Sequence, residues 1–115
     1  MKLVVIAMAT AILAACATPA ELREHGTRYT HESRLAPREA AGCVGRAAEN
    51  YRSDWNAQWR EGAQPGSYEV IIGPGGRTFI VDVAPAKGGS LVTLYAPGEV
   101  LSTISGGLAS AIKGC

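Results

Sequence analysis

Residues 67–96 read SYEVIIGPGGRTFIVDVAPAKGGSLVTLYA and contain three apolar runs separated by glycine and proline. The runs span residues 67–73, 77–84 and 90–96, and they are rich in β-branched and aromatic side chains, which favours strands. Two short connections join the runs. Parallel strands would need crossovers of a dozen or more residues, so this stretch predicts antiparallel hairpins.

The three expected strands are apolar on both faces. Alternation places one set of side chains toward the helices: Val70, Ile72, Phe79, Val81, Val83, Val92 and Leu94. It places a second set outward: Ile71, Ile80, Leu91 and Tyr95, with Asp82 and Thr93. Two interpretations of the outward face stay open. Either it is uncovered and receives a partner, or Trp55, Trp59 or a loop covers it. Asp82 is expected to be solvated there, without a second acid to form a catalytic pair.

Helices are expected on both sides of these strands. Pro37 and Glu39 suit a first helical turn, and apolar residues at three- and four-residue steps predict a helix over 37–51. After Pro97, residues 98 and 99 open a last helix, in which Gly106 and Gly107 indicate a kink or a close approach to the sheet. The apolar side of that helix comprises Val100, Leu101, Ile104, Leu108, Ala111 and Ile112.

Residues 56–61 allow two interpretations. The first helix could continue through Trp55 and Trp59, or Asn56–Glu61 could form an edge strand with Trp59 packed inward. The second is preferred because Ser53 and Asp54 favour a turn. The expected fold is α+β: a two-layer sandwich in which a three- to four-stranded antiparallel sheet is flanked by an N-terminal and a C-terminal helix.

The chain opens with Lys2 and an uncharged apolar run from Leu3 to Ala15. A helix of that length spans about 20 Å, which is too short for a bilayer core of about 30 Å. The run therefore resembles the apolar region of a signal peptide rather than a membrane span. It ends in the sequence Leu13-Ala14-Ala15-Cys16.

This tetrapeptide resembles the lipobox of bacterial lipoproteins. The resemblance implies a signal peptide over residues 1–15, a diacylglyceryl group on Cys16, and acylation of the new amino terminus by a fatty acid such as palmitate. Ala17 stands where an Asp would mark retention in the inner membrane, so the pattern resembles that of lipoproteins on the periplasmic face of the outer membrane. The membrane is thus the first expected partner.

Residues 16–36 are polar and poor in large apolar side chains, and we expect the lipidated cysteine followed by a flexible tether. A chain of that length reaches roughly 25 Å. His25 and His31 would be solvated tether residues. The folded domain is expected to span 37–115, and it resembles small envelope lipoproteins that end in Gly-Cys, which implies no activity.

Cys43 and Cys115 remain once lipidation has consumed Cys16. An even number of cysteines in an oxidising compartment predicts a structural disulfide. The absence of a C-x-x-C motif or a nearby histidine disfavours a redox pair or a metal site. In the chain-entropy model such a bridge stabilises the domain by roughly 4.4 kcal/mol.

The composition and motifs predict no catalytic residues, no cofactor and no metal. The formal net charge of +1 offers no basic excess for nucleic acid. Ser110 and Lys113 match a Ser-x-x-Lys pattern without the other motifs of the enzymes that use it. We expect a non-catalytic interaction or structural module that docks an envelope protein or dimerises through its sheet. The alternative is a ligand binder or a hydrolase inhibitor. The candidate contact residues are Ile71, Ile80, Leu91, Tyr95, Trp55 and Trp59.

Overall fold

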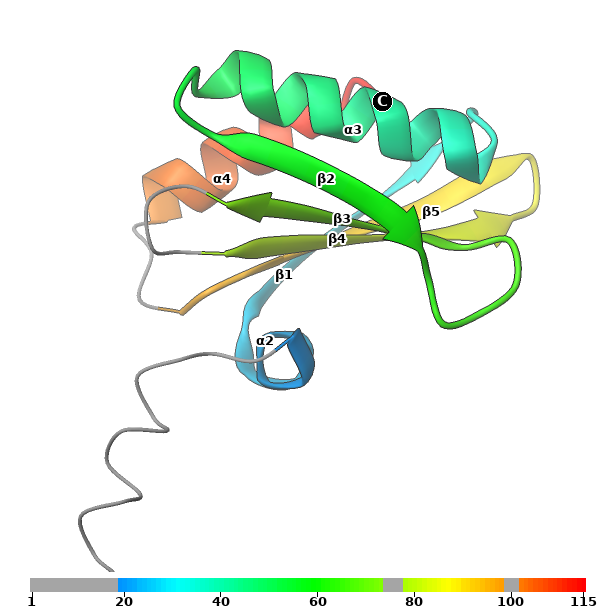
Figure 1. Cartoon of the computed structure of the whole chain (residues 1–115), viewed down its shortest axis with the longest axis horizontal. Helices are drawn as coiled ribbons and strands as arrows, with labels where there is room; N and C mark the ends of the chain where they lie inside the picture. The colour runs from blue at the N-terminus through cyan, green and yellow to red at the C-terminus, as the bar shows by residue number, and fades with distance from the viewer. Residues whose placement is uncertain (1–18, 74–77, 99–101) are drawn as a thin grey trace, which may run out of the picture.

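The structure is a computed structural model that describes residues 19–73, 78–98 and 102–115. The expected signal peptide and Cys16 lie outside the described residues, as do residues 74–77 and 99–101. The fold is α+β, as the sequence predicts (Figure 1). Its elements in chain order are α2 (Pro19–His25), β1 (Thr27–Ser33), α3 (Pro37–Tyr51), β2 (Asn56–Glu61), β3 (Tyr68–Gly73), β4 (Phe79–Ala86), β5 (Gly89–Ala96) and α4 (Ser102–Ile112).

One antiparallel sheet of five strands contains all the strands described, in the order β1-β5-β4-β3-β2. The strand predicted at Asn56–Glu61 is confirmed as β2, at one edge. The expected count of three or four strands is wrong because β1 pairs with β5 along its whole length, from Thr27 opposite Ala96 to Ser33 opposite Ser90. As an edge strand that uses one side for pairing, β1 does not need the apolar run that marks the central strands.

The segment before residue 37 is folded rather than a flexible tether over its described part. α2 lies on the face of the sheet opposite α3 and α4 (Figure 1), and its Leu22 is only 4% exposed. The expected domain boundary at residue 37 is therefore wrong, and the domain includes Pro19–Ser33. Only residues 17 and 18 separate the expected lipid site, Cys16, from the first described helix.

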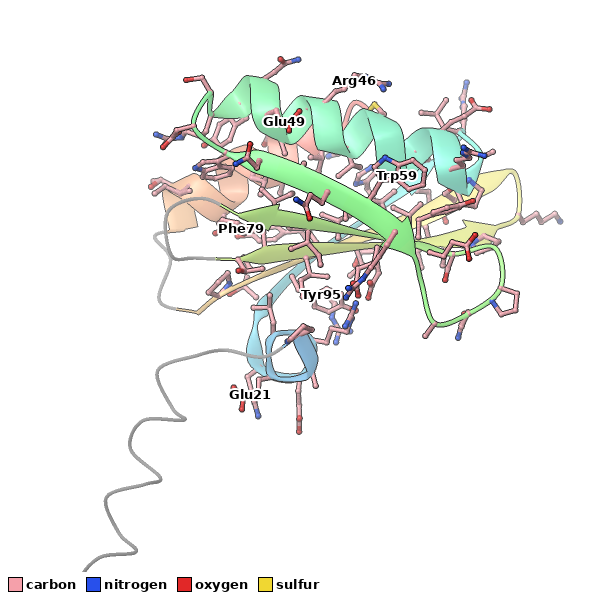
Figure 2. The ribbon with its side chains drawn as sticks, in the orientation of Figure 1. Glu21, Arg46, Glu49, Trp59, Phe79 and Tyr95 are labelled. Carbon is pink, nitrogen blue, oxygen red and sulfur yellow. A yellow bond between two sulfur atoms is a disulfide. The ribbon has the colours of Figure 1, made fainter. Side chains whose placement is uncertain are left out.

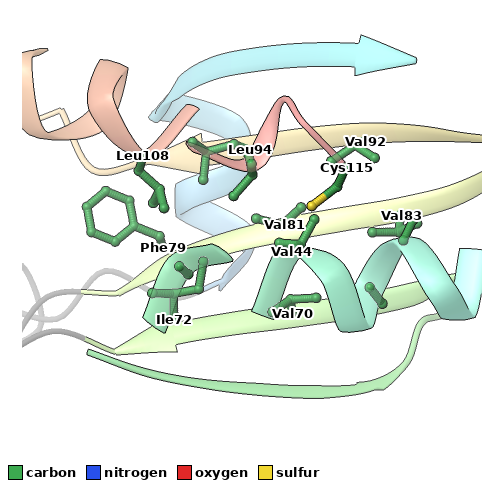
Figure 3. Packing of buried hydrophobic residues seen from close by; sticks show 14 of the residues in the cluster. Val44, Val70, Ile72, Phe79, Val81, Val83, Val92, Leu94, Leu108 and Cys115 are labelled. Atoms are coloured by element: carbon green, nitrogen blue, oxygen red, sulfur yellow. The ribbon is translucent and has the colours of Figure 1, made fainter. Parts of the chain in front are cut away.

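The core lies between the sheet and the helices α3 and α4 (Figure 3). The seven strand residues predicted to face the helices are all buried in it. α3 spans the predicted range 37–51 and contributes small residues, which let the helix approach the sheet closely. Its buried residues are Ala40, Ala41, Val44 and Ala48. Leu108 and Ile112 of α4 complete this layer.

A disulfide joins Cys43 of α3 to Cys115, as predicted, with 5.7 Å between the two Cα atoms. The hydroxyl of Ser33, at the end of β1, also donates a hydrogen bond to the carbonyl of Cys115. The chain following α4 is thus tied both to α3 and to the edge strand. A covalent tie of this kind matters in a small domain, whose apolar core alone gives a narrow margin of stability.

The glycine pair in α4 marks a close approach, but to another helix rather than to the sheet. A Cβ atom on Gly107 would stand 2.1 Å from the hydroxyl oxygen of Tyr51 in α3. A Cβ atom on Gly106 would meet nothing within 4 Å. The ring of Tyr51 packs edge-on against Trp55, with 5.6 Å between ring centroids, so it is not free to move aside. Gly107 is therefore the position where the α3–α4 contact requires glycine.

Gly107→Ala is expected to destabilise the domain by about 1–3 kcal/mol, because the added methyl group overpacks the contact with Tyr51. Gly106→Ala is the matched control, and it should stabilise the domain by about 0.5–1 kcal/mol through better helix propensity. Urea unfolding of both variants measures the difference. Equal stability of the two variants would contradict the close contact.

Candidate functional site

The outer face of the sheet, opposite α3 and α4, carries two cross-strand rows of side chains. The strand register aligns one row that is apolar in its middle, at Tyr95, Ile80 and Ile71, and polar at its two ends, at Arg28 and Gln58. It aligns a polar row beside it, which consists of Thr30, Thr93, Asp82, Glu69 and Arg60. Charged side chains therefore occupy the middle of a face expected to be apolar.

Three charged residues of the polar row, Arg60, Glu69 and Asp82, form an ion cluster with Arg23. We call these four residues the outer-face ion cluster. Arg23, from α2, donates from Nε and Nη2 to the two carboxylate oxygens of Asp82 at 2.8 and 2.7 Å. The same Nη2 also donates to Glu69. Arg60 donates from Nε to the other oxygen of Glu69 at 2.7 Å. One arginine thus joins α2 to two adjacent strands, β3 and β4.

The charges in the cluster stabilise each other. Burial by itself raises the pKa of the Glu69 carboxyl, but hydrogen bonds from Arg23 and Arg60 outweigh it and hold that pKa below its usual range. The hydrogen bond to Asp82 raises the pKa of the Arg23 guanidinium despite its partial burial. Glu69 is therefore ionised at neutral pH and has no proton to donate as a general acid. The cluster acts as an electrostatic clamp that holds α2 against β3 and β4.

The expectation that Asp82 stands alone and solvated is wrong. Glu69 lies directly opposite Asp82 in the β3–β4 register, and its side chain is 9% exposed. Alternation along the strand could have found Glu69, since it shares a face with Ile71 two residues later. No local pattern could have found Arg23, which lies 46 and 59 residues from its two acidic partners.

A cavity of about 400 Å³ opens beside the cluster. Arg23, Glu69 and Asp82 line one part of it, and residues 62–64 of the β2–β3 loop line another. The cavity therefore has paired charges on one side and small or apolar residues, among them Ala63, Val83 and Ala84, on the rest of its wall.

Two of the expected contact residues are buried and unable to meet a partner. Ile80 is 1% exposed on the outer face, where α2 lies. Trp55 is 7% exposed and stacks on Phe79 in the core, with 5.2 Å between ring centroids. The outer face is thus partly covered, and its cover is α2 rather than a tryptophan or a loop. Ile71 and Tyr95 stay half-buried, and Leu91 is exposed.

Trp59 is not packed inward, although it lies on the helix-facing side of β2. Because β2 is an edge strand, α3 covers this ring incompletely and leaves Trp59 46% exposed (Figure 2). The Arg38 guanidinium lies 5.7 Å from the centre of the indole ring, and Tyr68 packs edge-on at 5.5 Å. We call Arg38, Trp59 and Tyr68 the β2-edge cluster. It is an exposed aromatic and cationic group beside an edge strand.

A second cavity, of about 280 Å³, lies between β1 and α4 and brings together His31, Ser110 and Lys113. His31 is half-buried rather than solvated, and its Nε2 atom is buried without a hydrogen-bond partner. Burial and the nearby Lys113 charge lower the pKa of His31, so its ring is neutral at pH 7. His25 is exposed, as expected.

Arg23→Gln is expected to destabilise the domain by about 1–2 kcal/mol, a value kept small because the side chain of Arg23 is one-third exposed to solvent. The change leaves the buried Glu69 with one partner and loosens α2. Arg60→Gln is the control, since the side chain of Arg60 is 63% exposed and, among the described residues, pairs with Glu69 alone. Urea unfolding and amide hydrogen exchange in α2 measure the effect. A loss as large for Arg60→Gln as for Arg23→Gln would contradict the clamp.

No family model, curated protein or solved structure matches the chain. Within residues 19–73, 78–98 and 102–115, no helix is long and apolar enough to cross a membrane. The same residues contain no group of three or more His, Cys, Asp or Glu side chains placed to hold a metal ion.

Proposed function

We propose that this chain is a bacterial lipoprotein, anchored through Cys16 to the periplasmic face of the outer membrane, whose domain is a non-catalytic interaction module. The observation that carries the proposal is the sequence Leu13-Ala14-Ala15-Cys16 at the end of an apolar run that is too short to span a bilayer. Two or three acyl chains would hold the domain stably on a membrane, whereas one chain binds weakly.

The disulfide supports export of the chain. A bridge between Cys43 and Cys115 persists in an oxidising compartment and is rare in the cytosol, where thiols stay reduced. A periplasmic location satisfies this requirement, and it is the location that the lipobox-like sequence implies.

The arrangement of the described acidic and histidine side chains supports a non-catalytic role. Glu69 and Asp82 are adjacent acids, but both are held by Arg23, and Glu69 is ionised. His31 shares a cavity with Ser110, yet among the described residues no hydrogen bond links this pair, and Nε2 of His31 has no partner. A nucleophile with its base would need such a link.

The β2-edge cluster is the surface best suited to a protein partner. β2 ends the sheet on one side, and although its Ala57 amide donates to Glu49, an edge strand has further backbone groups that can pair with an added strand. Trp59 and Arg38 stand beside that edge, and tryptophan and arginine are the residue types that most often dominate binding energy in interfaces. We therefore place the partner contact at β2 and Trp59.

One observation favours the alternative function, a ligand-binding or hydrolase-inhibiting lipoprotein. The 400 Å³ cavity lies beside the β2–β3 loop and is lined by Arg23, Glu69 and Asp82. A cavity with a few convergent polar groups is the usual form of a small-molecule site. In this alternative the ligand would contact the paired charges on one side and the apolar side chains of Ala63, Val83 and Ala84 on the rest of the wall.

Cys16→Ser is expected to release the protein from membranes, because the acyl chains are attached through that thiol. Fractionation of cells expressing the wild type and the variant measures the shift from the membrane pellet to the soluble fraction. Persistent pelleting of Cys16→Ser would contradict the anchor.

Trp59→Glu is expected to abolish a specific crosslink to an envelope protein in intact cells, because it places a charge in the centre of the proposed contact. Gln58→Glu is the matched control: its side chain is exposed on the opposite face of the same strand. Crosslinking followed by affinity capture and mass spectrometry measures both. A partner that survives Trp59→Glu but not Tyr95→Lys would place the contact on the outer face instead. A folded monomer with no partner would favour ligand binding.

A further inference from the structure

We propose that the lipid surface lies against the α2 side of the domain, so that α3 and the β2-edge cluster face away from the membrane. The inference rests on the proposed function, since it takes Cys16 as the lipid-bearing residue. It concerns a property that lipidation alone does not determine, namely which side of the domain meets the phospholipid headgroups.

The chain between the anchor and the folded domain is short. Two residues, Ala17 and Thr18, separate Cys16 from Pro19, where α2 begins, so the connection is three residue steps long. A fully extended chain spans at most about 3.6 Å per residue, so the lipid-bearing residue lies within about 11 Å of the start of α2. The expected tether of roughly 25 Å reach is therefore replaced by a connection less than half as long.

α2 is fixed to the rest of the domain. Leu22 is buried, and Arg23 bonds to Asp82 and Glu69 on two strands. At the other end of the helix, the Gly26 amide donates to the Leu22 carbonyl at 2.9 Å. A Cβ atom on Gly26 would stand 2.7 Å from the Ala96 carbonyl oxygen, so the chain passes directly into β1 against β5. α2 therefore cannot serve as a flexible extension of the connection.

The position of α2 in the fold determines which side of the domain faces the anchor. It lies on one side of the sheet, and α3 and α4 lie on the other (Figure 1). α2 has seven residues and is about 10 Å long at 1.5 Å per residue, so no part of it carries the anchor far from the outer face. A membrane held within about 11 Å of Pro19 therefore stands on the α2 side. Arg46 on the exposed side of α3 points away from it (Figure 2).

The surface on the α2 side has the chemistry of a headgroup contact. Tyr95 points to this side (Figure 2), and the Arg28 guanidinium lies 5.5 Å from the centre of its ring. Leu91 is exposed on the same face. Tyrosine and leucine tolerate the boundary between lipid and water, and a guanidinium matches a phosphate diester. Glu24 adds an exposed negative charge to this side. The acyl anchor, rather than net electrostatic attraction to the headgroups, therefore sets the orientation. A change in salt concentration should not reverse it.

The experiment uses the full-length lipidated protein in vesicles of phosphatidylethanolamine and phosphatidylglycerol. A photoreactive p-benzoylphenylalanine replaces either Arg28 on the outer face or Arg46 on α3, two exposed arginines on opposite sides of the domain. Lipid crosslinking is expected to be several-fold higher from position 28 than from position 46. Equal crosslinking, or more from position 46, would overturn the orientation.

A second variant tests the short connection directly. A flexible Gly-Ser insertion of about 12 residues between Thr18 and Pro19 extends the reach to roughly 20 Å or more without altering the fold. The difference between positions 28 and 46 should then disappear. A difference that persists would mean that the connection does not set the orientation, and would overturn that cause.

The lipid on Cys16 is measured separately, by mass spectrometry of the N-terminal peptide. An unmodified Cys16 would overturn both the proposed function and the orientation. A lipidated Cys16 with crosslinks from position 46 would leave the anchor intact and overturn the orientation alone.

Discussion

The central strands are apolar on both faces, so the fold needs a cover on each side of the sheet. α3 and α4 supply one cover from residues that follow the helical pattern. The other cover is α2, which has only seven residues and a single buried side chain, Leu22. So short a helix cannot be held by apolar contact alone, and the ion pairs of Arg23 with Asp82 and Glu69 supply the remaining attachment. The position of α2 depends on those pairs.

The same interaction links the fold to the chemistry of the face. Glu69 is nearly buried, and a buried carboxylate without partners would be unfavourable. Arg23 and Arg60 donate hydrogen bonds to the Glu69 carboxylate and keep it ionised. The most polar part of the sheet therefore serves to hold α2 in place. The surfaces that remain for recognition are those outside the outer-face ion cluster. They are the β2 edge with Trp59 on one side and the region of Tyr95 and Arg28 on the other.

Much of the fold could be predicted because its signals are local. The helix at 37–51, the strand at 56–61 and the three hairpin strands follow from spacing, turn residues and side-chain branching in short windows. The Cys43–Cys115 bridge followed from counting cysteines in an oxidising compartment. β1 and the attachment of α2 to the sheet were missed because residues 19–33 carry little apolar periodicity. β1 is held by hydrogen bonds to β5, and α2 by an arginine that meets acids far away in the chain.

The candidate site shows the same division. Asp82 and Tyr95 could be placed on the outer face by alternation, but Ile80 and Trp55 could not be recognised as buried. Their cover comes from α2 and from the stacking of Trp55 on Phe79. Trp59 remains exposed because β2 is the last strand in the sheet, and strand order is a long-range property.

By itself, the sequence determined the α+β class, the hairpins, the disulfide pair and the expectation of a lipid anchor, since each depends on neighbouring residues or on a count. Only the tertiary structure decided that residues 19–33 belong to the domain, that Arg23 bonds to Glu69 and Asp82, and that α2 covers the outer face. The physical reason is that these features depend on pairings between segments more than 40 residues apart. Their free energy arises only when the sheet has formed and brings those segments together.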